Sequence, residues 1–509
     1  NRFQYNWTNT ASYNFVPADG HTIDFLLGTE FIMADIRTMY TRSKGYPSAK
    51  FVTQDNAAAV TAGSTTRDQW SLWSQFASVA YNLNEKYFVT GSLRRDGSSR
   101  FGENEKYGIF WSGSAGWNLH EESFLAGVGP ISQLKLRGAI GTSGNVPNEL
   151  YASRGFYGFV SYNDQVASAP TQLENKDLKW EENFNYSIGV DFGVIDNRIS
   201  GSIDYYRRNT RDLLFPSPVS RTVGFDSRLE NIGEILNKGF EIELVGDVLR
   251  GNGFNLRLLA SIATNDNQVL NLNNGGEDII NANSGITILR EGQKVNTFYL
   301  VRYAGVDPSN GQELWYDKDG NVTNVWNGDD AVALEDKSPL ATYFGNFGFE
   351  ASYKGISLNA SFYYQGGGYT MNYAYNRDLL GDGGNSRGNQ RADALDYWKA
   401  PGDIGVLPAP SLFNQSNDSD RYLQKTDYIR LRNVSLSYSL PKTILEKIWM
   451  QDIQIYVQAT NLWTYNPYFD GDPEVGRGSD ESDLTLMGEA TLYTYPNTRG
   501  FTAGINLTF

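Results

Sequence analysis

The sequence predicts an all-β protein, a transmembrane antiparallel β-barrel, and three observations support that prediction. The last eleven residues place Phe501, Ala503, Ile505, Leu507 and Phe509 on one face of a strand, with small or polar residues between them. The same period of two recurs in about 15 segments of the chain. The connectors between these segments alternate between short and long. A strand with one apolar and one polar face, repeated many times, is how a chain crosses a bilayer as a closed barrel.

Composition argues against several other classes of protein. The 509 residues include no cysteine and only two histidines, His21 and His120, so disulfides, thiolate metal sites and histidine-based catalysis are not expected. Aromatic residues make up 14% of the chain, with 32 Tyr and 52 Gly, which suits many strands and turns. No apolar run approaches the roughly 18 residues of a membrane helix. The net charge of −15 argues against a nucleic-acid partner, which would require a basic face.

Alternation and strand-forming residues predict one strand in each of fifteen segments, taken in chain order. A clear example is the segment in which Ile356, Leu358, Ala360 and Phe362 share one face. The segments are 2–17, 21–35, 69–81, 86–98, 107–119, 133–143, 179–192, 197–210, 236–247, 253–267, 341–353, 356–366, 427–440, 452–463 and 499–509.

The connectors predict which end of each strand faces the cell exterior. The short ones are 18–20, 82–85, 120–132, 193–196, 248–252, 354–355 and 441–451. The long ones are 36–68, 99–106, 144–178, 211–235, 268–340, 367–426 and 464–498, of which 99–106 is itself short. Outer-membrane barrels have short periplasmic turns and long extracellular loops. The final strand therefore runs inward and ends on the periplasmic side.

The number of strands predicts a larger polypeptide. Bacterial single-chain barrels have an even number of strands, whereas fifteen are expected here and both the first and the last run inward. The chain begins Asn1-Arg-Phe-Gln-Tyr, already alternating and without Met or a signal peptide. We therefore expect an odd number of strands upstream, about seven if the barrel has about 22 as in the plugged outer-membrane transporters. The alternative is a miscounted strand, for which 69–81 and 236–247 are the weakest segments.

Three connectors are expected to contain structure of their own. Acidic residues after His120 predict a helical turn there, and Lys442 to Trp449 predicts a second one with Thr443 as its cap. The 268–340 connector is long enough to need a hairpin, which we place around Tyr299 to Trp315.

Several blocks of sequence, in a fixed order along nearly the whole chain, resemble the SusC/RagA family of TonB-dependent outer-membrane transporters. The blocks are Arg94-Arg-Asp96-Gly97-Ser-Ser99-Arg100-Phe101-Gly102, Ser114-Ala-Gly116-Trp117, Glu122-Ser-Phe124, Leu178-Lys-Trp180-Glu181, Gly189-Val-Asp191-Phe192-Gly193, Asp204-Tyr205-Tyr206, Thr210-Arg-Asp212-Leu213-Leu214, Asn231-Ile-Gly233, Asn237-Lys-Gly239-Phe240-Glu241, Tyr428-Ile-Arg430-Leu431-Arg-Asn433, Asn461-Leu462 and Asp472-Pro-Glu474-Val475.

This resemblance implies a 22-stranded barrel, filled by an amino-terminal plug, in the outer membrane of a Gram-negative bacterium of the Bacteroidota. It implies a SusD-like surface lipoprotein as a lid and import of oligosaccharides or peptides driven by TonB–ExbB–ExbD. The plug and the TonB-contacting segment are not in the given sequence, so the residues that couple to TonB cannot be assigned. Phe509 resembles the terminal aromatic signal by which such barrels are recognised for insertion. Two alternatives stay open: a SusC-like scaffold in an assembly or secretion complex, and a passive porin.

The small and aromatic residues of these blocks also have structural interpretations. Four glycines are predicted to form tight turns or bulges in the barrel wall, namely Gly97, Gly102, Gly116 and Gly239. Three tryptophans near strand ends are predicted to form an interface girdle, namely Trp117, Trp180 and Trp463.

Candidate substrate contacts lie in the 367–426 loop. Sugars bind on aromatic faces with amides and carboxylates around them, because their C–H faces are apolar and their rims are polar. Ordinary loop packing, or contact with a lid partner, would explain the same residues. The candidates are Tyr369, Tyr373, Tyr375, Tyr397 and Trp398.

Two acidic segments were considered as cation sites. Asp317-Lys-Asp319-Gly320-Asn321 opens like a Ca²⁺ loop, but it lacks a third acid before the glycine, and its twelfth place is Gly328 rather than Glu. A turn with a left-handed glycine is the favoured interpretation. The acidic 464–498 loop predicts a solvated face, or one that bridges divalent cations to lipopolysaccharide.

Enzyme motifs were not found. No Gly-x-x-x-x-Gly-Lys-Ser/Thr loop occurs, and His120-Glu121 lacks the second histidine of a zinc helix. The sequence therefore predicts a transporter and not an enzyme.

Overall fold

The structure is a computed structural model, and it describes residues 1–51, 53–125, 128–162, 165–225, 227–251, 253–272, 275–281, 284–373, 390–405, 407–410, 417–474, 490–491 and 495–509. Its main feature is one large sheet in which fifteen strands follow each other in chain order and a further short strand, β15, pairs with β13. The fifteen are β1 (Arg2–Phe15), β2 (His21–Lys44), β3 (Ala59–Leu83), β4 (Tyr87–Ser98), β5 (Tyr107–Asn118), β6 (Ile131–Asn145), β9 (Glu181–Val194), β10 (Ile199–Arg211), β13 (Glu234–Gly251), β14 (Phe254–Thr264), β23 (Tyr343–Tyr353), β24 (Ile356–Gly366), β27 (Tyr428–Ser439), β28 (Asp452–Tyr465) and β30 (Gly500–Thr508).

This sheet confirms the predicted all-β wall. Each of the fifteen predicted segments overlaps one of its strands. The order runs from β1 to β30, and these two edge strands do not pair with each other, so the described sheet is not closed into a barrel. The prediction falls short mainly at β2 and β3, which are 24 and 25 residues long and pair as far as Lys44 and Ala59. Their outer halves are rich in Thr, Ser and Arg, so the backbone ladder continues where apolar alternation, the signal used for prediction, has ended.

The chain divides into two compact units. The first comprises Asn1–Trp117, Arg137–Tyr186 and Asn209–Glu234. Besides its sheet strands it holds two hairpins, β7 (Phe156–Tyr162) with β8 (Gln165–Gln172) and β11 (Leu214–Pro218) with β12 (Ser227–Asn231).

A small apolar core lies beside these hairpins. Phe101, Ala152 and Leu178 are buried in it, and Trp180 packs against Phe101 with ring centroids 4.6 Å apart. Trp180 also donates from its indole nitrogen to the carbonyl of Lys106. The prediction of Trp180 as an interface residue is therefore wrong, because this ring fills a core instead of facing lipid.

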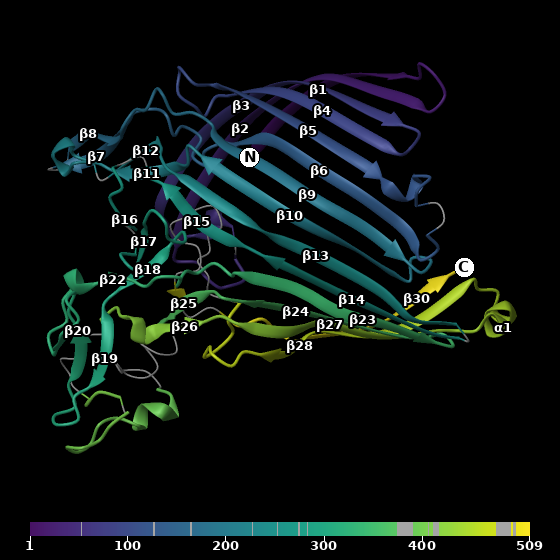
Figure 1. Cartoon of the computed structure of the whole chain (residues 1–509). Coiled ribbons are helices and arrows are strands. Elements are labelled where there is room, and N and C mark those ends of the chain that lie inside the picture. The colour runs from purple at the N-terminus through teal and green to yellow at the C-terminus, as the bar shows by residue number, and fades with distance from the viewer. Residues whose placement is uncertain are drawn as a thin grey trace. The chain divides into compact units, whose positions relative to one another are not determined.

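The second unit comprises Asn118–Leu136, Ser187–Arg208 and Ile235–Phe509. Its long connectors form small sheets at the end of the strands opposite the α1 turn (Figure 1). Their strands are β16 (Ile279–Ile280), β17 (Thr287–Leu289), β18 (Thr297–Leu300), β19 (Arg302–Val306), β20 (Glu313–Tyr316), β21 (Val322–Thr323), β22 (Val332–Ala333), β25 (Tyr369–Asn372), β26 (Leu423–Lys425) and β29 (Ala490–Thr491). The connector strand β15 (Asp266–Asn271) instead extends the large sheet beside β13. The pairing of β19 with β20 confirms the predicted hairpin around Tyr299 to Trp315.

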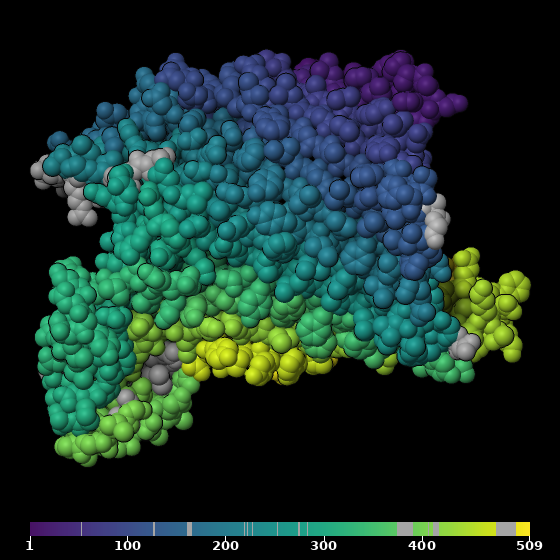
Figure 2. Space-filling model, in the orientation of Figure 1, coloured from purple at the N-terminus to yellow at the C-terminus, as the bar shows by residue number. Residues whose placement is uncertain are grey.

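Two loop segments of this unit that are far apart in the sequence lie against each other, as the teal and green lobe of Figure 2 shows. Gly402 donates from its backbone nitrogen to the carbonyl of Pro308, and Ala409 donates to that of Gly311. The described parts of the 268–340 and 367–426 connectors therefore form one loop assembly.

The helices of the described residues are short. A 3₁₀ turn at Leu119–Glu121 and α1 (Lys442–Leu445) confirm the two predicted helical turns. Thr443 is not the cap that the sequence suggested: Pro441 holds that position, and Thr443 lies inside the first turn. Within the described part of the chain, no helix has the length and apolar character that a membrane span requires.

Two of the four glycines predicted as turns or bulges have another role, namely Gly102 and Gly239. Gly97, Gly116 and Gly239 lie inside β4, β5 and β13, and none of the four has a positive φ. A Cβ atom on Gly239 would lie 1.8 Å from the carbonyl oxygen of Thr264, and one on Gly102 would lie 2.0 Å from that of Lys176. The fold requires glycine at these two positions because another part of the backbone approaches closely, and not because the chain turns.

Candidate functional site

The pairing of β14, β23, β24, β27, β28 and β30 gives the wall of the second unit two different faces. One face carries apolar rows, for example Leu258, Phe349, Ala360, Val434, Ala459 and Phe501. The next row, on the other face, is Leu259, Gly348, Ser361, Asn433 and Thr460. In a barrel wall the apolar rows face lipid and the polar rows face the lumen.

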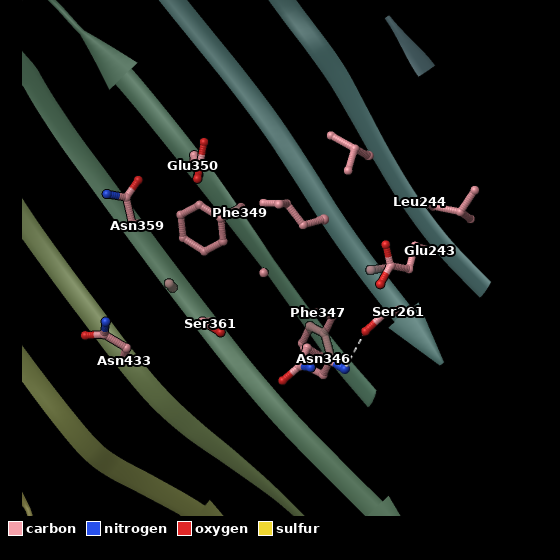
Figure 3. A pocket seen from close by; sticks show the side chains of 15 residues that line it. Glu243, Leu244, Ser261, Asn346, Phe347, Phe349, Glu350, Asn359, Ser361 and Asn433 are labelled. Carbon is pink, nitrogen blue, oxygen red and sulfur yellow. Dashed lines mark hydrogen bonds between the residues drawn. The ribbon is translucent and has the colours of Figure 1, made fainter. Parts of the chain in front are cut away.

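A recess of about 410 Å³ lies in this wall, and its lining combines apolar residues with polar side chains of the lumenal rows (Figure 3). Asn346 and Ser261 border it at one end, and Asn359 and Glu350 border it at the other. Asn346 donates from its backbone nitrogen to the Ser261 hydroxyl at 3.2 Å. The recess therefore offers amides, hydroxyls and carboxylates, which hydrogen-bond a polar solute. We call these residues the wall recess.

Gly348 explains why the wall is hollowed at this point. It occupies the middle row, between Leu259 and Ser361, and contributes no side chain. A Cβ atom at this position would lie 2.4 Å from the carbonyl oxygen of Ala360, so a larger residue would force the strands apart. Gly348 thus leaves space in the wall that a side chain would fill.

A charged cluster continues the polar face toward the short-turn end of the strands. Arg257 donates to Asp247 at 2.8 Å and lies 3.9 Å from Glu350, which also borders the wall recess. Arg250 makes a second ion pair with Asp247. The carboxylates of Asp247 and Glu350 are thus both held by arginines of the wall.

At the long-loop end of the strands, the loop assembly has a hydrophobic core of its own. Phe298 and Met371 are fully buried, and Tyr373 and Tyr422 pack with them. The loops are therefore held together by packing of their own.

The structure places the predicted substrate contacts in different environments. Tyr373 is 8% exposed and belongs to the loop core, whereas Tyr369 is half-buried, with the ammonium groups of Lys337 and Lys425 5.8 and 6.0 Å from its ring centroid. Trp398 covers Gly311 and donates from its indole nitrogen to the Pro308 carbonyl at 3.1 Å. Tyr397, next to it, is half-buried, and Tyr375 lies outside the described residues. Substrate contact by Tyr369, Tyr397 and Trp398 stays a prediction.

An arginine network that sequence reasoning missed joins the last long loop to the wall. Arg430 on β27 is 2% exposed and is paired with Asp472 and Glu474, the latter at 2.6 Å. Arg432 also pairs with Glu474, and the Tyr428 hydroxyl donates to it at 2.9 Å. The signal was present in the sequence, since an Arg-x-Arg strand and an Asp-Pro-Glu loop stand out separately.

The Asp317 segment forms the turn that the sequence favoured. Its carboxylate accepts hydrogen bonds from the backbone nitrogens of Asp319 and Asn321 and from the Asn321 amide, and Gly320 has φ +87°. These donors lower the pKa of Asp317, with the Asn321 side chain as the largest cause. The Asp317 carboxylate thus accepts the hydrogen bonds that stabilise the turn. No cluster of three or more metal-ligating residues occurs in the described ranges.

Together, the two-faced wall, the sorted connectors and the polar recess define an outer-membrane β-barrel. The family model described as TonB-dependent receptor-like, β-barrel, matches residues 1–364. The chain belongs to that family and, within it, to the SusC/RagA group.

Among its relatives, TonB-dependent receptor P3 of Formosa agariphila is 30% identical, over 100% of this chain and 53% of the relative. TonB-dependent receptor SusC of Bacteroides thetaiotaomicron is 27% identical, over 86% of this chain and 44% of SusC. Among solved structures, that of the RagAB peptide transporter matches with a TM-score of 0.87 and 26% identity, over 100% of this chain and 56% of that one. The chain thus spans about half the length of the relatives it matches.

Proposed function

We propose that this chain is the wall of an outer-membrane importer for oligosaccharides or peptides. It would work with a SusD-like surface lipoprotein as its lid and take its energy from TonB–ExbB–ExbD. The observation that carries the proposal is the wall recess on the lumenal face, together with a loop assembly that has its own core. The volume of the wall recess lies within the roughly 300–1,000 Å³ range of small-molecule sites.

The physical chemistry of import supports each part. Between its two edge strands, the sheet satisfies its backbone groups by strand pairing, which a chain in lipid requires. The loop assembly would capture substrate at the outer rim, where Trp398, Tyr397 and Tyr369 are the proposed contacts. The wall recess would then offer Asn359, Asn346 and other amides and hydroxyls, which suit sugar hydroxyls and peptide groups equally.

The test is growth of the native bacterium with the full-length gene deleted. We expect loss of growth on a restricted set of oligosaccharides or peptides and normal growth on monosaccharides and amino acids. Loss on all substrates would instead indicate a scaffold. Uptake that survives removal of TonB would indicate a porin.

Complementation with variants then tests the recess itself. Asn359→Leu replaces a recess amide by a similar apolar volume, and we expect it to lower the uptake rate. The matched control is Asn506→Leu, on β30, which removes a lumenal amide outside the recess. Equal uptake by both variants would contradict a role for the recess.

A further inference from the structure

The lipid-facing side of the first unit is interrupted by a polar row. Pairing of β1 to β4 aligns Asn9, Thr29, Gln75 and Arg95 on the face that elsewhere carries exposed apolar residues. On β5 the row ends at the apolar Ile109, which pairs with Arg95. The row below it is Ala11, Leu27, Ala77, Leu93 and Trp111, and the row above it is Trp7, Phe31, Trp73, Gly97 and Tyr107. We call the row that contains Asn9, Thr29, Gln75 and Arg95 the polar row.

The polar row lies in the outer leaflet. β4 runs from the short turn before Tyr87, on the periplasmic side, to the 99–106 loop, and Arg95 stands eight residues along it. A strand rises about 3.3 Å per residue and is tilted by about 40°, which places Arg95 about 20 Å above Tyr87. The apolar band of such barrels is about 25 Å tall. An arginine is tolerated there because the outer interface supplies polar headgroups.

Arg95 is held in a defined position. Its guanidinium lies 4.0 Å from the ring centroid of Tyr107, and it reaches the Gln75 side-chain oxygen at 3.5 Å. The Tyr107 ring lies across Gly97, where a Cβ atom would come within 2.5 Å of it. A preorganised, exposed cation on a lipid-facing surface is suited to an anionic headgroup.

Below the polar row lies an apolar groove of about 570 Å³. Its floor is formed by the small residues Ala11, Ala77 and Gly91, and Leu27, Val79 and Leu93 are among its walls. A groove of this kind on a lipid-facing surface accepts an acyl chain.

Above the polar row lies a polar hollow of about 660 Å³, where the 99–106 loop meets the loop after β6. Serines line it together with the cations Lys106, Arg154 and Lys176 and the anions Glu103 and Glu174. Lys176 lies 3.9 Å from Glu174, and with Arg95 the cations of the hollow and the polar row number four against two carboxylates. The volume of the hollow is far larger than that of a single phosphate group, so the hollow has room for a larger polar group.

We propose that groove, polar row and hollow form one site for a phosphorylated glycolipid of the outer leaflet, of the lipopolysaccharide type. The groove would take an acyl chain, Arg95 a phosphate, and the hollow the sugar headgroup. A glycerophospholipid would fill the groove and reach Arg95 but leave the hollow empty, so the hollow selects the glycolipid. The site lies on the outside of the wall and does not depend on the proposed import function.

The test is native mass spectrometry of the full-length protein in detergent, titrated in turn with lipid A, dephosphorylated lipid A and phosphatidylglycerol. We expect lipid A to be retained best. Dephosphorylated lipid A should bind roughly fivefold more weakly for each ion pair that a phosphate makes with an arginine or lysine of the site. Equal retention of both forms of lipid A would overturn the proposal. Retention of phosphatidylglycerol as tight as that of lipid A would overturn the choice of glycolipid.

Two variants with matched controls locate the site. Arg95→Gln should weaken lipid A roughly fivefold, whereas Lys86→Gln, in the turn at the other end of β4, should not. Gly91→Leu should fill the groove without a clash, because its Cβ would meet only Val79 at 3.8 Å. Gly113→Leu is its control, since it lies beside Gly91 in the same row but outside the groove. Retention is compared only among variants that stay compact on unheated gels, and equal retention by variants and controls would overturn the proposal.

Discussion

In the second unit, the wall and the loop assembly are stabilised in different ways. Apolar side chains of the wall point outward, and residues such as Leu258, Val457 and Phe501 are 46, 51 and 74% exposed. The loop assembly is built like a small soluble domain, with Phe298 and Met371 fully buried. The wall depends on its membrane and its backbone ladder, and the loops depend on packing. The two should therefore respond to different substitutions.

The largest effect is expected from Phe298→Ala. Phe298 is 0% exposed in the loop core, so its truncation should cost about 3–5 kcal/mol, all of it within the loop assembly. Limited proteolysis should cut the loops, while heat-modifiable gel migration should show an intact wall. The control is Val322→Ala, whose side chain is 55% exposed. If the wall unfolded with the loops, the separation of the two regions would be disproved.

The converse experiment is Leu258→Arg in the wall. Leu258 lies four residues from the start of β14 on the lipid-facing side, near the middle of the bilayer. An arginine there should destabilise the wall by about 2–4 kcal/mol, measured by urea unfolding in liposomes. Its neighbour Leu259 faces the lumen, so Leu259→Arg should cost much less. Equal costs would mean that the two faces have been assigned incorrectly.

A smaller effect is expected where the wall and a loop are joined. Glu474→Gln removes the charge that Arg430 and Arg432 share, and losing hydrogen bonds to a charged group costs about 1.5–3 kcal/mol. Hydrogen exchange should rise around Asp472, while exchange within β14 and β23 stays slow. Glu446→Gln, on an exposed short turn, is the control. Unchanged exchange around Asp472 would show that the network does not hold the loop.

The same contrast explains how much the sequence could predict. All fifteen wall strands were predictable, because a wall between lipid and water forces each strand into a period of two, as in β24 and β30. Fold class and family followed from this alternation and from the sequence blocks. The ends of β2 and β3 were not predictable in this way, because polar residues continue the ladder outside the membrane.

The candidate site was harder to predict for two physical reasons. The wall recess depends on Gly348 lying between Leu259 and Ser361, and strand register is not visible in a single sequence. In the loops, aromatic residues serve both packing and binding, so Tyr373 was named as a contact although it is buried. Arg430 and Glu474 are 44 residues apart, and only the fold brings them together.

The smallest effect is expected from acid in the loop assembly. The hydrogen bonds that Asp317 accepts lower its pKa below the ordinary 3.8, so the folded turn favours the ionised form. The stabilisation is therefore fully present above about pH 4 and is lost as the pH falls through the lowered pKa of the folded state. We expect protease cleavage between β20 and β21 to increase below pH 4, and Asp317→Asn to show increased cleavage already at pH 7. Asp319→Asn is the control, because at this position only the backbone nitrogen donates to Asp317. A pH dependence that persists unchanged in Asp317→Asn would assign the acid sensitivity to another group and leave the turn without a role in loop stability.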